Sequence, residues 1–469
     1  MQIQKMSFDT ISKERTLRID YSYHKYVADI PSDYYTFNDL FYIRKNKVDS
    51  ENLPDSFFYC EIGNTNGDGE VDPSFLDCNN RTLEQDDLFK KVENGDIISV
   101  KENYILLSKI RPNLNKVIRI THCNKELFFT SAFSELEPKI LPVILYYCLR
   151  KLFHNSIMAI SRQGKGYPTL NEKDYVFLKF DKKIIDILCH EEKRITDSIV
   201  QIENDIFSLK KTLTPEQSII DRIFQKELNC DYQTFAKLRK VSIFHTGFNA
   251  FSNNPDLRFS VKFHRPSGEF VKQEFAAITE KKIKHFLAEP ILLGASISPS
   301  DFDENGECYY ISMATIKTYS VELDDSQLLS KSYSVLNKDK KVEKDDIIMN
   351  RSGVAIGKLA MVDQDVEGIF ADFTMRIRFA NYNPLFGYYY MRSKYFQYLI
   401  EIYKKGLQNQ NIFPVVIREF PLPDIALEEQ DRIVKEIQAE IEKQSQIARQ
   451  IADLRTQIDA LIESTLKEG

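Results

Sequence analysis

At 469 residues the chain is longer than one hydrophobic core usually supports, so we expect two or more domains. Hydrophobic residues make up 43% and charged residues 28%, a balance typical of globular proteins, and no apolar run approaches the ~18 residues that would indicate a membrane span. The net charge of −6 excludes a uniformly basic chain, but ten acidic and six basic residues fall in Leu427–Gly469, so the rest of the chain is close to neutral.

The seven cysteines include no C-x-x-C pair, and their odd number argues against a disulfide framework. The histidines show no metal-ligand spacing, so we expect neither a metal nor a cofactor in this chain. The first 15 residues lack an apolar signal-peptide core, which favours a cytoplasmic location.

The first part of the chain predicts a mixed α+β domain. Short β-branched and aromatic runs between Asn, Gly, Asp and Pro predict strands, for example Asp96–Val100. Alternating aromatic residues also predict a strand around His24, and another around His264 later in the chain. An aromatic helix is expected around Tyr146, followed by a glycine-containing loop.

Two helices are predicted next. From Ile195 to Leu213, apolar residues recur at steps of four and three, which is a heptad seam. Thr214-Pro215 is a suitable start for a separate helix from Glu216 to about Leu228.

The chain then repeats this order. An aromatic helix is expected around Tyr389, followed by a glycine loop and two prolines at 421 and 423, which disfavour helix just before them. A second seam runs from Ile433 to Leu461 and is interrupted by two polar positions, Glu440 and Gln444.

Six pairs of similar segments, in the same order, indicate a duplication. They are Leu17–Lys25 with Leu257–Arg265, Tyr59–Gly63 with Tyr309–Met313, Asn94–Ser99 with Lys344–Met349, Leu141–Arg150 with Asn383–Arg392, Gly166–Leu170 with Asn411–Val415, and Glu191–Ile195 with Glu428–Ile433.

A narrow heptad stripe cannot bury itself, so each long helix needs a partner. Because both helices leave equivalent points of two duplicated domains, we expect them to pair as an antiparallel coiled coil within the chain. The alternatives are that each helix packs on its own domain or that the helices pair between molecules.

Two similar domains separated by helices suit a ligand with two half-sites, and duplex DNA is the commonest such ligand. Motifs for catalysis are missing: the sequence contains no Asn-Pro-Pro-aromatic motif, no P-loop and no G-x-G-x-x-G. We therefore expect a protein that is not an enzyme.

The chain resembles the specificity subunits of type I restriction–modification systems over nearly its whole length. The resemblance is carried by "LRIDYSY", by "GDII…SKIRPNLNK" (Gly95–Lys116), by "DDIIMNRSGVAIGK" (Asp345–Lys358), by "GLQNQNIFP" (Gly406–Pro414) and by "PLPDIALEEQDRIVKEI" (Pro421–Ile437). The last is the most specific, because the proline step, Glu-Glu-Gln and the helix occur together.

This resemblance implies a non-catalytic subunit that recognises a bipartite target in double-stranded DNA. It implies target recognition domains at 1–182 and 230–424, a central helical spacer at 183–229 and a C-terminal spacer helix at 425–469. The implied partners are two DNA adenine methyltransferase subunits, which bind S-adenosylmethionine, and restriction or motor subunits. DNA methylation and phage defence would be the biological setting.

Loops rich in basic and amide side chains are the candidates for DNA contact, since Arg and Lys suit guanine or phosphate and Asn and Gln suit adenine. In the second copy these are Lys404, Lys405, Gln408, Asn409, Gln410 and Asn411, together with Arg351, Ser352, Gly353 and Lys358. In the first copy they are Arg162, Gln163 and Lys165, together with Lys109, Arg111 and Lys116 in the loop analogous to Arg351–Lys358. For Gly63–Gly69, the acidic Asp68 favours a plain turn.

Two alternatives stay open. The chain could be the specificity protein of a different methylation or phage-defence system, or a scaffold whose two domains bind proteins and not DNA.

Overall fold

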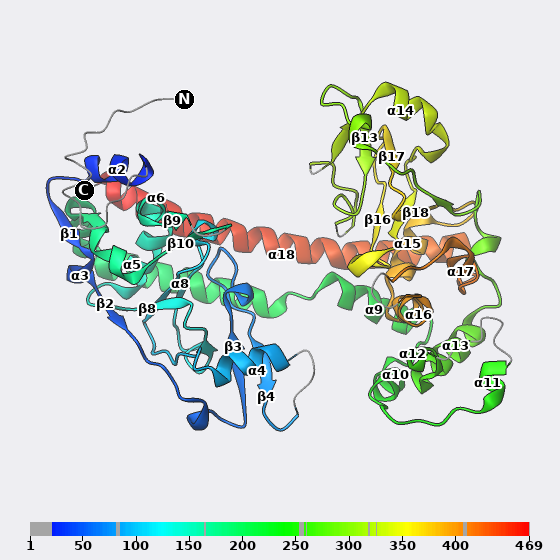
Figure 1. Ribbon diagram of the computed structural model, residues 1–469, viewed down its shortest axis with the longest axis horizontal. Helices are drawn as coiled ribbons and strands as arrows, with labels where there is room; N and C mark the ends of the chain where they lie inside the picture. The colour runs from blue at the N-terminus through cyan, green and yellow to red at the C-terminus, as the bar shows by residue number, and fades with distance from the viewer. Residues whose placement is uncertain are drawn as a thin grey trace. The chain divides into compact units, whose positions relative to one another are not determined.

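The structure is a computed structural model that describes residues 21–80, 85–163, 166–252, 258, 260–317, 319–324, 326–406 and 410–468. The chain forms two compact units (Figure 1). Unit 1 comprises Met1–Lys211 and Gln450–Gly469, and unit 2 comprises Thr212–Arg449. In the described part of the chain, no helix combines the length and the apolar character needed to cross a membrane.

Unit 1 contains a four-stranded sheet and a three-stranded sheet. The first has the order β2 (Phe41–Arg44), β8 (Phe133–Pro138), β5 (Ile105–Ser108) and β6 (Val117–Arg119), and the second has the order β4 (Ser74–Asp77), β3 (Ser56–Cys60) and β7 (Phe128–Phe129). The other described strands of unit 1 form two antiparallel pairs, β1 (Tyr34–Thr36) with β11 (Lys179–Asp181) and β9 (Arg162–Gln163) with β10 (Pro168–Thr169).

Unit 2 has the same two sheets. The four-stranded sheet has the order β12 (Leu292–Leu293), β18 (Thr374–Ile377), β15 (Ile347–Asn350) and β16 (Leu359–Met361), and the three-stranded sheet has the order β14 (Gln327–Leu329), β13 (Cys308–Ile311) and β17 (Gly368–Phe370). In both three-stranded sheets one pair is antiparallel and the other parallel. The chain therefore consists of two duplicated mixed α/β units.

The registers agree residue by residue. Leu107 pairs with Val117 in unit 1 and Met349 pairs with Leu359 in unit 2, both partners being displaced by 242 residues. Left-handed backbone recurs at the same three positions around these strands. Asn103 and Asp345 precede β5 and β15, and Arg111 with Asn115 in unit 1 and Gly353 with Gly357 in unit 2 lie in the loop that joins the two strands.

The described helices divide between the two units. In unit 1 they are α2 (Tyr21–Ala28), α3 (Phe37–Leu40), α4 (Asp86–Glu93), α5 (Pro142–Tyr147), α6 (His154–Ile160), α7 (Lys182–His190) and α8 (Glu192–Thr212). In unit 2 they are α9 (Glu216–Glu227), α10 (Tyr232–Arg239), α11 (Phe248–Ser252), α12 (Val261–His264), α13 (Pro266–Ile278), α14 (Lys331–Leu336), α15 (Pro384–Arg392), α16 (Lys394–Tyr403) and α17 (Pro414–Ile417). Helix α18 (Leu427–Glu468) begins in unit 2 and ends in unit 1.

Helices α5 and α15 show the duplication in their side chains. Arg150 donates to the hydroxyl of Tyr146 one turn earlier at 3.1 Å, and Arg392 donates to the hydroxyl of Tyr388 at the same distance. In both units the guanidinium also lies over the ring of that tyrosine, Arg150 from the π-helical turn Cys148–Leu152 that continues α5 and Arg392 from the last residue of α15. These buried pairs explain why Leu141–Arg150 and Asn383–Arg392 are similar in sequence.

Three sequence predictions about local structure are wrong. His24 lies in helix α2 and His264 in helix α12, where strands were expected. Within Asp96–Val100 only Ile98 forms bridges, one to Lys47 and one to Phe129, and the strand that follows is β5. Consequently Lys344–Met349, which leads into β15, corresponds to residues 102–107, which lead into β5, and not to Asn94–Ser99.

In unit 1, helix α8 lies along the C-terminal part of α18. Arg194 near the start of α8 donates to Thr465 near the end of α18 at 3.3 Å. Lys210 near the end of α8 and Arg455 of α18 bind the same carboxylate, that of Glu70. The two helices therefore run antiparallel here.

In unit 2, helix α9 lies along the N-terminal part of α18. The Thr214 N–H, in the break between α8 and α9, donates to Gln444 Oε1 at 2.8 Å. At the other end of α9, Lys226 donates to Glu436 at 3.1 Å. This pair is also antiparallel, and Gln444 interrupts the apolar seam where the partner helix is itself interrupted.

The proline step before α18 is bound to the unit 2 core. The hydroxyl groups of Tyr390 and Tyr382 donate to the carbonyl oxygens of Pro421 and Pro423, each at 3.0 Å. The buried Gln430 side chain accepts from the Asn383 N–H at 2.9 Å and donates to the Ile425 carbonyl at 2.8 Å. These contacts fix the start of α18 on its domain.

Candidate nucleic-acid interface

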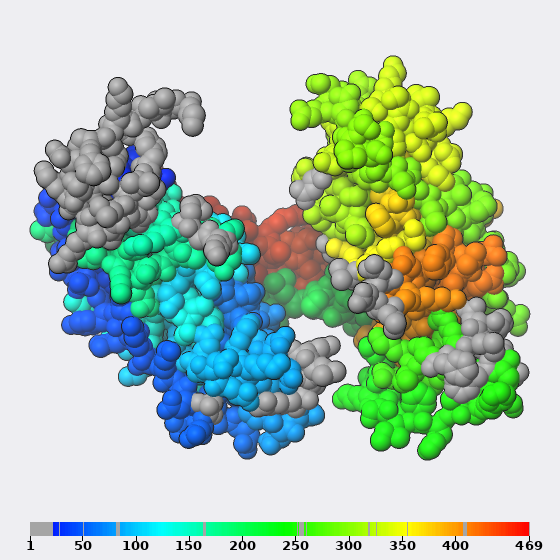
Figure 2. Space-filling model, in the orientation of Figure 1, coloured from blue at the N-terminus to red at the C-terminus, as the bar shows by residue number. Residues whose placement is uncertain are grey.

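The predicted contact residues of unit 2 come from two chain segments that lie together. The Gly353 N–H donates to the Gln410 carbonyl at 3.2 Å, and the Ile412 N–H donates to the Arg351 carbonyl at 2.9 Å. We call Arg351–Gly353 with Lys404–Gly406 and Gln410–Ile412 the unit 2 loop cluster. In Figure 2 the yellow segment that carries β16 to β18 lies directly against the orange segment that carries α16 and α17.

Arg351 is fixed within this cluster by both backbone and side chain. Its Nε donates to the Asp372 carbonyl at 2.8 Å, and its Nη1 is 3.4 Å from Asn411 Oδ1, which also accepts from the Ser352 hydroxyl. Its half-buried guanidinium is therefore held in one orientation, with Nη2 making no hydrogen bond to any other described residue. A group oriented in this way is suited to forming two hydrogen bonds with a base or a phosphate.

Further cations belong to the same two chain segments. Among the described residues, Lys358 and Lys404 have no hydrogen-bond or ion-pair partner for their ammonium groups, and Lys358 is exposed. Lys405 and Asn411 form a pair of backbone hydrogen bonds of 2.8 and 2.7 Å that closes the loop between them. Of the predicted amides, Gln410 and Asn411 lie in the cluster, whereas Gln408 and Asn409 are outside the described residues.

Unit 1 has the same arrangement, displaced by 242 residues. The Arg111 N–H donates to the Pro168 carbonyl at 2.9 Å, and the Leu170 N–H donates to the Lys109 carbonyl at 2.8 Å. We call Lys109–Arg111 with Pro168–Leu170 the unit 1 loop cluster. Lys109 and Arg111 therefore occupy the places of Arg351 and Gly353, within the loop that the sequence predicted to be analogous.

Arg111 differs from its counterpart in one physical respect. Its φ is 51°, in the left-handed region where glycine is favoured, and the equivalent position in unit 2 is Gly353 with φ 75°. The exposed guanidinium lies 5.2 Å from the ring centre of Tyr167 and has no hydrogen bond to another described side chain. An arginine retained at a strained position is a reason to look for a functional role.

The other unit 1 candidates make contacts within the protein. Arg162 forms two hydrogen bonds of 2.7 and 2.6 Å to the carboxylate of Asp174, which is 1% exposed. Lys109 lies 3.5 Å from Glu172. Lys116 donates to the Ile62 carbonyl at 2.7 Å, and burial, together with the charge of Arg111, lowers its pKa. Lys165 and the Gln163 side chain are outside the described residues.

Residues 66–70 form a turn, as the sequence predicted. This acidic turn also contacts the helices of unit 1, which the sequence did not indicate. Asp68 accepts from Arg455 at 2.8 Å, and Glu70 accepts from Arg455 and Lys210. Burial acts to raise the pKa of Glu70, but these two cations lower it below its ordinary value. The turn thus links the β-strand region of unit 1 to α8 and α18.

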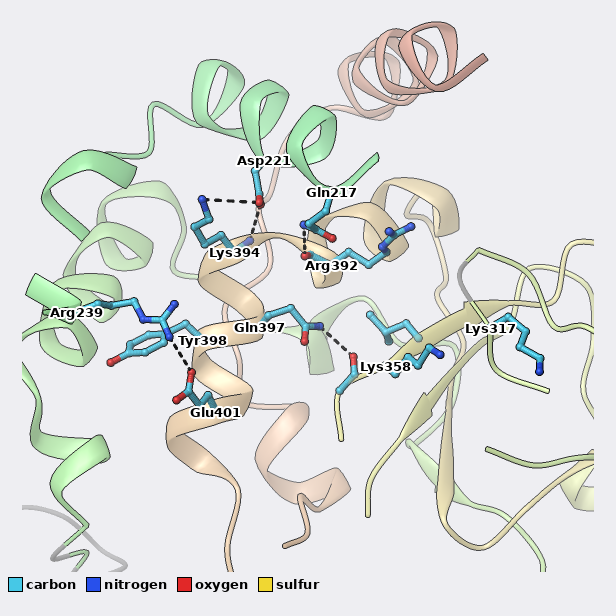
Figure 3. Close-up of a pocket in the computed structure, with 12 residues that line it drawn as sticks. Gln217, Asp221, Arg239, Lys317, Lys358, Arg392, Lys394, Gln397, Tyr398 and Glu401 are labelled. Atoms are coloured by element: carbon cyan, nitrogen blue, oxygen red, sulfur yellow. Dashed lines mark hydrogen bonds and ion pairs between the residues drawn. The ribbon is translucent and has the colours of Figure 1, made fainter. Parts of the chain in front are cut away.

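A cavity of about 450 Å³ in unit 2 lies where the loop after β15 meets α9 and α16 (Figure 3). The Gln397 amide of α16 donates to the carbonyls of Gly357 and Met391, at 3.0 and 2.8 Å. Asp221 of α9 accepts from the Lys394 N–H at the first residue of α16 at 2.8 Å, and burial raises the pKa of this carboxyl. Gln397 and Asp221 therefore position the loop that carries Lys358, and no local sequence pattern could have identified them.

No group of three or more His, Cys, Asp or Glu side chains in the described ranges could hold a metal ion. All seven cysteines are free, and burial raises the pKa of Cys60 to about 12, so this thiol is unreactive at neutral pH.

No protein-family model and no curated protein matches the chain. Three solved structures resemble it along nearly its whole length. One comes from a study of complex assembly and conformational transition of the type I restriction–modification system. It is 12% identical to this chain, the alignment covers 93% of this chain and 98% of the other, and the TM-score is 0.40. The specificity subunit HsdS from Thermoanaerobacter tengcongensis is 12% identical, with 93% and 97% covered and a TM-score of 0.30. The type I system S subunit from M. genitalium is 14% identical, with 93% and 96% covered and a TM-score of 0.42.

Proposed function

We propose that this chain is the non-catalytic DNA-specificity subunit of a type I restriction–modification system. Each unit's recognition domain, 1–182 or 230–424, reads one half of a bipartite duplex target through its loop cluster, and the helices at 183–229 and 425–469 set the distance between the halves. The single observation that carries the proposal is the duplicated loop cluster, with the same backbone hydrogen bonds displaced by 242 residues and different side chains presented.

The chemistry of these clusters fits DNA. Arg351, Lys358 and Lys404 in unit 2 and Arg111 in unit 1 supply positive charge for phosphates or guanine, and Gln410 and Asn411 supply amides for adenine. A shared backbone with different side chains is what two readers of different half-sites need, because phosphate contacts position the protein and base contacts specify the sequence.

The proposed partners follow the same assignment. Two DNA adenine methyltransferase subunits, carrying S-adenosylmethionine, would bind the outward faces of the spacer helices, including Glu436–Lys443, and restriction or motor subunits would join them in the cytoplasm. In this complex the chain directs DNA methylation and defence against phage DNA, and contributes no catalytic residue.

The test is the binding of duplex DNA by the full chain purified with its methyltransferase partner, across a salt series. We expect affinity to fall steeply with salt, because several phosphate counterions are released, and footprinting to show two protected segments separated by several unprotected base pairs. Absence of DNA affinity at low salt would favour the protein-binding scaffold. Binding of a single continuous segment would contradict the two-reader arrangement.

A further inference from the structure

Three exposed apolar side chains adjoin the unit 2 loop cluster. They are Phe373, Phe413 and Val415, which are 52%, 40% and 60% exposed. The Phe373 carbonyl accepts from the Arg351 N–H at 3.0 Å, and Phe413 follows Ile412, whose N–H donates to the Arg351 carbonyl. Phe373 and Phe413 thus belong to the two chain segments that flank Arg351. Neither was among the contact residues predicted from the sequence.

The duplicated backbone identifies the equivalent positions in unit 1. Ala132 corresponds to Phe373, because its carbonyl accepts from the Lys109 N–H at 3.0 Å. Asn171 and Lys173 correspond to Phe413 and Val415, because they follow Leu170 as those residues follow Ile412. Unit 1 therefore has a small residue, an amide and a cation where unit 2 has two phenylalanines and a valine.

The local structure shows how Phe413 can occupy a position that is polar in the other unit. The Asn171 side chain accepts from the Lys173 N–H at 3.0 Å and so caps the helical turn that follows. Phe413 stands before Pro414 at the start of α17, and proline has no N–H that needs a cap in the first turn. The Val415 N–H, which corresponds to the Lys173 N–H, has no side-chain cap, and the fixed φ of Pro414 supports the first turn of α17 in its place.

An exposed apolar group beside Arg351 and the amides of Gln410 and Asn411 would stabilise binding if it contacted an apolar group of the ligand. In the major groove of duplex DNA, that group is the C5-methyl of thymine, whereas every other base edge presents hydrogen-bond donors or acceptors. Charged and amide side chains next to apolar ones therefore suit a half-site in which thymine adjoins guanine or adenine.

We propose that Phe373, supported by Phe413, reads the C5-methyl group of thymine in the half-site bound by unit 2, whereas unit 1 reads its half-site without such a contact. This inference rests on the proposed function and names a specificity determinant within it. Phe373 contacts the base directly, and Arg351 beside it supplies the polar contact.

The experiment compares two libraries of random duplexes, one with thymine and one with deoxyuracil, which lacks only the methyl group. The full chain in complex with its methyltransferase partner selects from both. We expect the thymine library to yield at least one fixed thymine in the unit 2 half-site, and replacement of that base by uracil to weaken binding about threefold to tenfold. Unit 1's half-site should be insensitive to the replacement.

The variant Phe373→Ala should bind the thymine duplex about as weakly as the unsubstituted protein binds the uracil duplex, and should no longer distinguish the two. Leu336→Ala is the matched control, because Leu336 is an apolar side chain of the same unit that is 80% exposed on α14. It should leave binding and the thymine preference unchanged. Equal thermal midpoints of the two variants show that both are folded.

The outcomes separate the two levels of the proposal. If the unsubstituted complex binds a bipartite target but tolerates uracil at every thymine, or if Phe373→Ala weakens thymine and uracil duplexes equally while keeping the preference, the methyl-reading role is wrong and the proposed function stands. If the complex selects no duplex from either library, both are wrong.

Discussion

Lys109 and Arg351 make the same pair of backbone hydrogen bonds in the two units of this chain. The Lys109 N–H donates to the Ala132 carbonyl at 3.0 Å and its carbonyl accepts from Leu170 at 2.8 Å, while the Arg351 N–H donates to the Phe373 carbonyl at 3.0 Å and its carbonyl accepts from Ile412 at 2.9 Å. The side chains differ in their contacts: Lys109 lies near Glu172, and Arg351 bonds the backbone of Asp372. The fold therefore fixes the backbone position of each residue, and the type of side chain determines which contacts form there.

The first prediction concerns the strained Arg111. Its substitution by glycine, the residue at the equivalent place in unit 2, removes a left-handed conformation that costs a non-glycine residue about 1–2 kcal/mol, against an entropic cost of glycine of about 0.4–1 kcal/mol. We expect Arg111→Gly to leave the free energy of unfolding unchanged or slightly raised, and to weaken DNA binding with a salt slope reduced by about one counterion.

Arg111→Ala is the control, because it also removes the charge but keeps the strain. It should weaken DNA binding as much as Arg111→Gly and be the less stable of the two in denaturant titration. Unaltered DNA affinity in both variants would remove Arg111 from the interface.

The second prediction concerns Arg162, which was selected as a DNA contact and binds a buried carboxylate. Arg162→Ala leaves Asp174 without its two hydrogen bonds, and because the arginine is about half exposed we expect a loss of about 1–3 kcal/mol in the free energy of unfolding. The double variant Arg162→Ala/Asp174→Asn should recover part of this loss, since it removes the unpaired charge. A double variant less stable than Arg162→Ala would show that the carboxylate does not depend on the arginine.

The third prediction concerns pH. Hydrogen bonds from Lys282 and Lys284 lower the pKa of Glu419 from 4.5 to about 2, so its contribution to stability is fully present above pH 4.5 and is lost as pH falls towards 2. We expect Glu419→Gln to lower the free energy of unfolding at pH 7 by less than about 1 kcal/mol, because the ion pair is partly exposed.

The difference between this variant and the unsubstituted protein should shrink as pH falls from 4.5 to 2, followed by denaturant titration at each pH. Glu304→Gln, at an exposed carboxylate with no ion pair to another described residue, is the control and should show no such dependence. A constant difference for Glu419→Gln across this range would mean that the contribution is not electrostatic.

The fourth prediction tests whether the helices set the distance between half-sites. Because α8 and α9 run antiparallel to α18, an insertion in α8 alone would displace Lys210 and Thr214 from their partners, so both helices must be lengthened together. Seven residues inserted after Leu209 and seven after Arg449 keep the heptad seam and add about 10 Å, or about three base pairs.

We expect this paired insertion to keep both half-site sequences and to lengthen the preferred gap, measured by selection from duplexes with different gaps. The same insertion in α8 alone should lower stability without defining a new gap. An unchanged gap in the paired variant would show that the helices do not set the distance between the half-sites.

Periodic features could be predicted from the sequence and short ones could not. The heptad seam and the Thr-Pro break predicted α8 and α9 almost to the residue, because a helical pattern sustained over several turns has no good alternative. Asp96–Val100 was assigned to a strand because Ile97, Ile98 and Val100 are apolar, and all three are indeed buried, but burial alone does not determine backbone conformation.

For the candidate site, the positions of the loops could be predicted from the sequence and the roles of individual side chains could not. Internal repetition located both loops, since similar residues must recur wherever the backbone recurs. The roles of individual side chains depend on distant partners, such as Asp174 for Arg162 and Asp372 for Arg351, and these pairings exist only in the folded chain. Phe373 was missed because a single exposed phenylalanine has no distinguishing pattern until its counterpart, Ala132, is known.

The most direct test of the central claim is the distribution of methylated adenines in a host that carries the system, with loop variants of each unit. The account predicts one bipartite motif with a gap of several base pairs. Gln410→Ala/Asn411→Ala in unit 2 should relax one half of it, and Arg111→Ala in unit 1 should affect only the other half. A motif without two halves, or a change in both halves from variants of either unit, would contradict the assignment of one half-site to each unit.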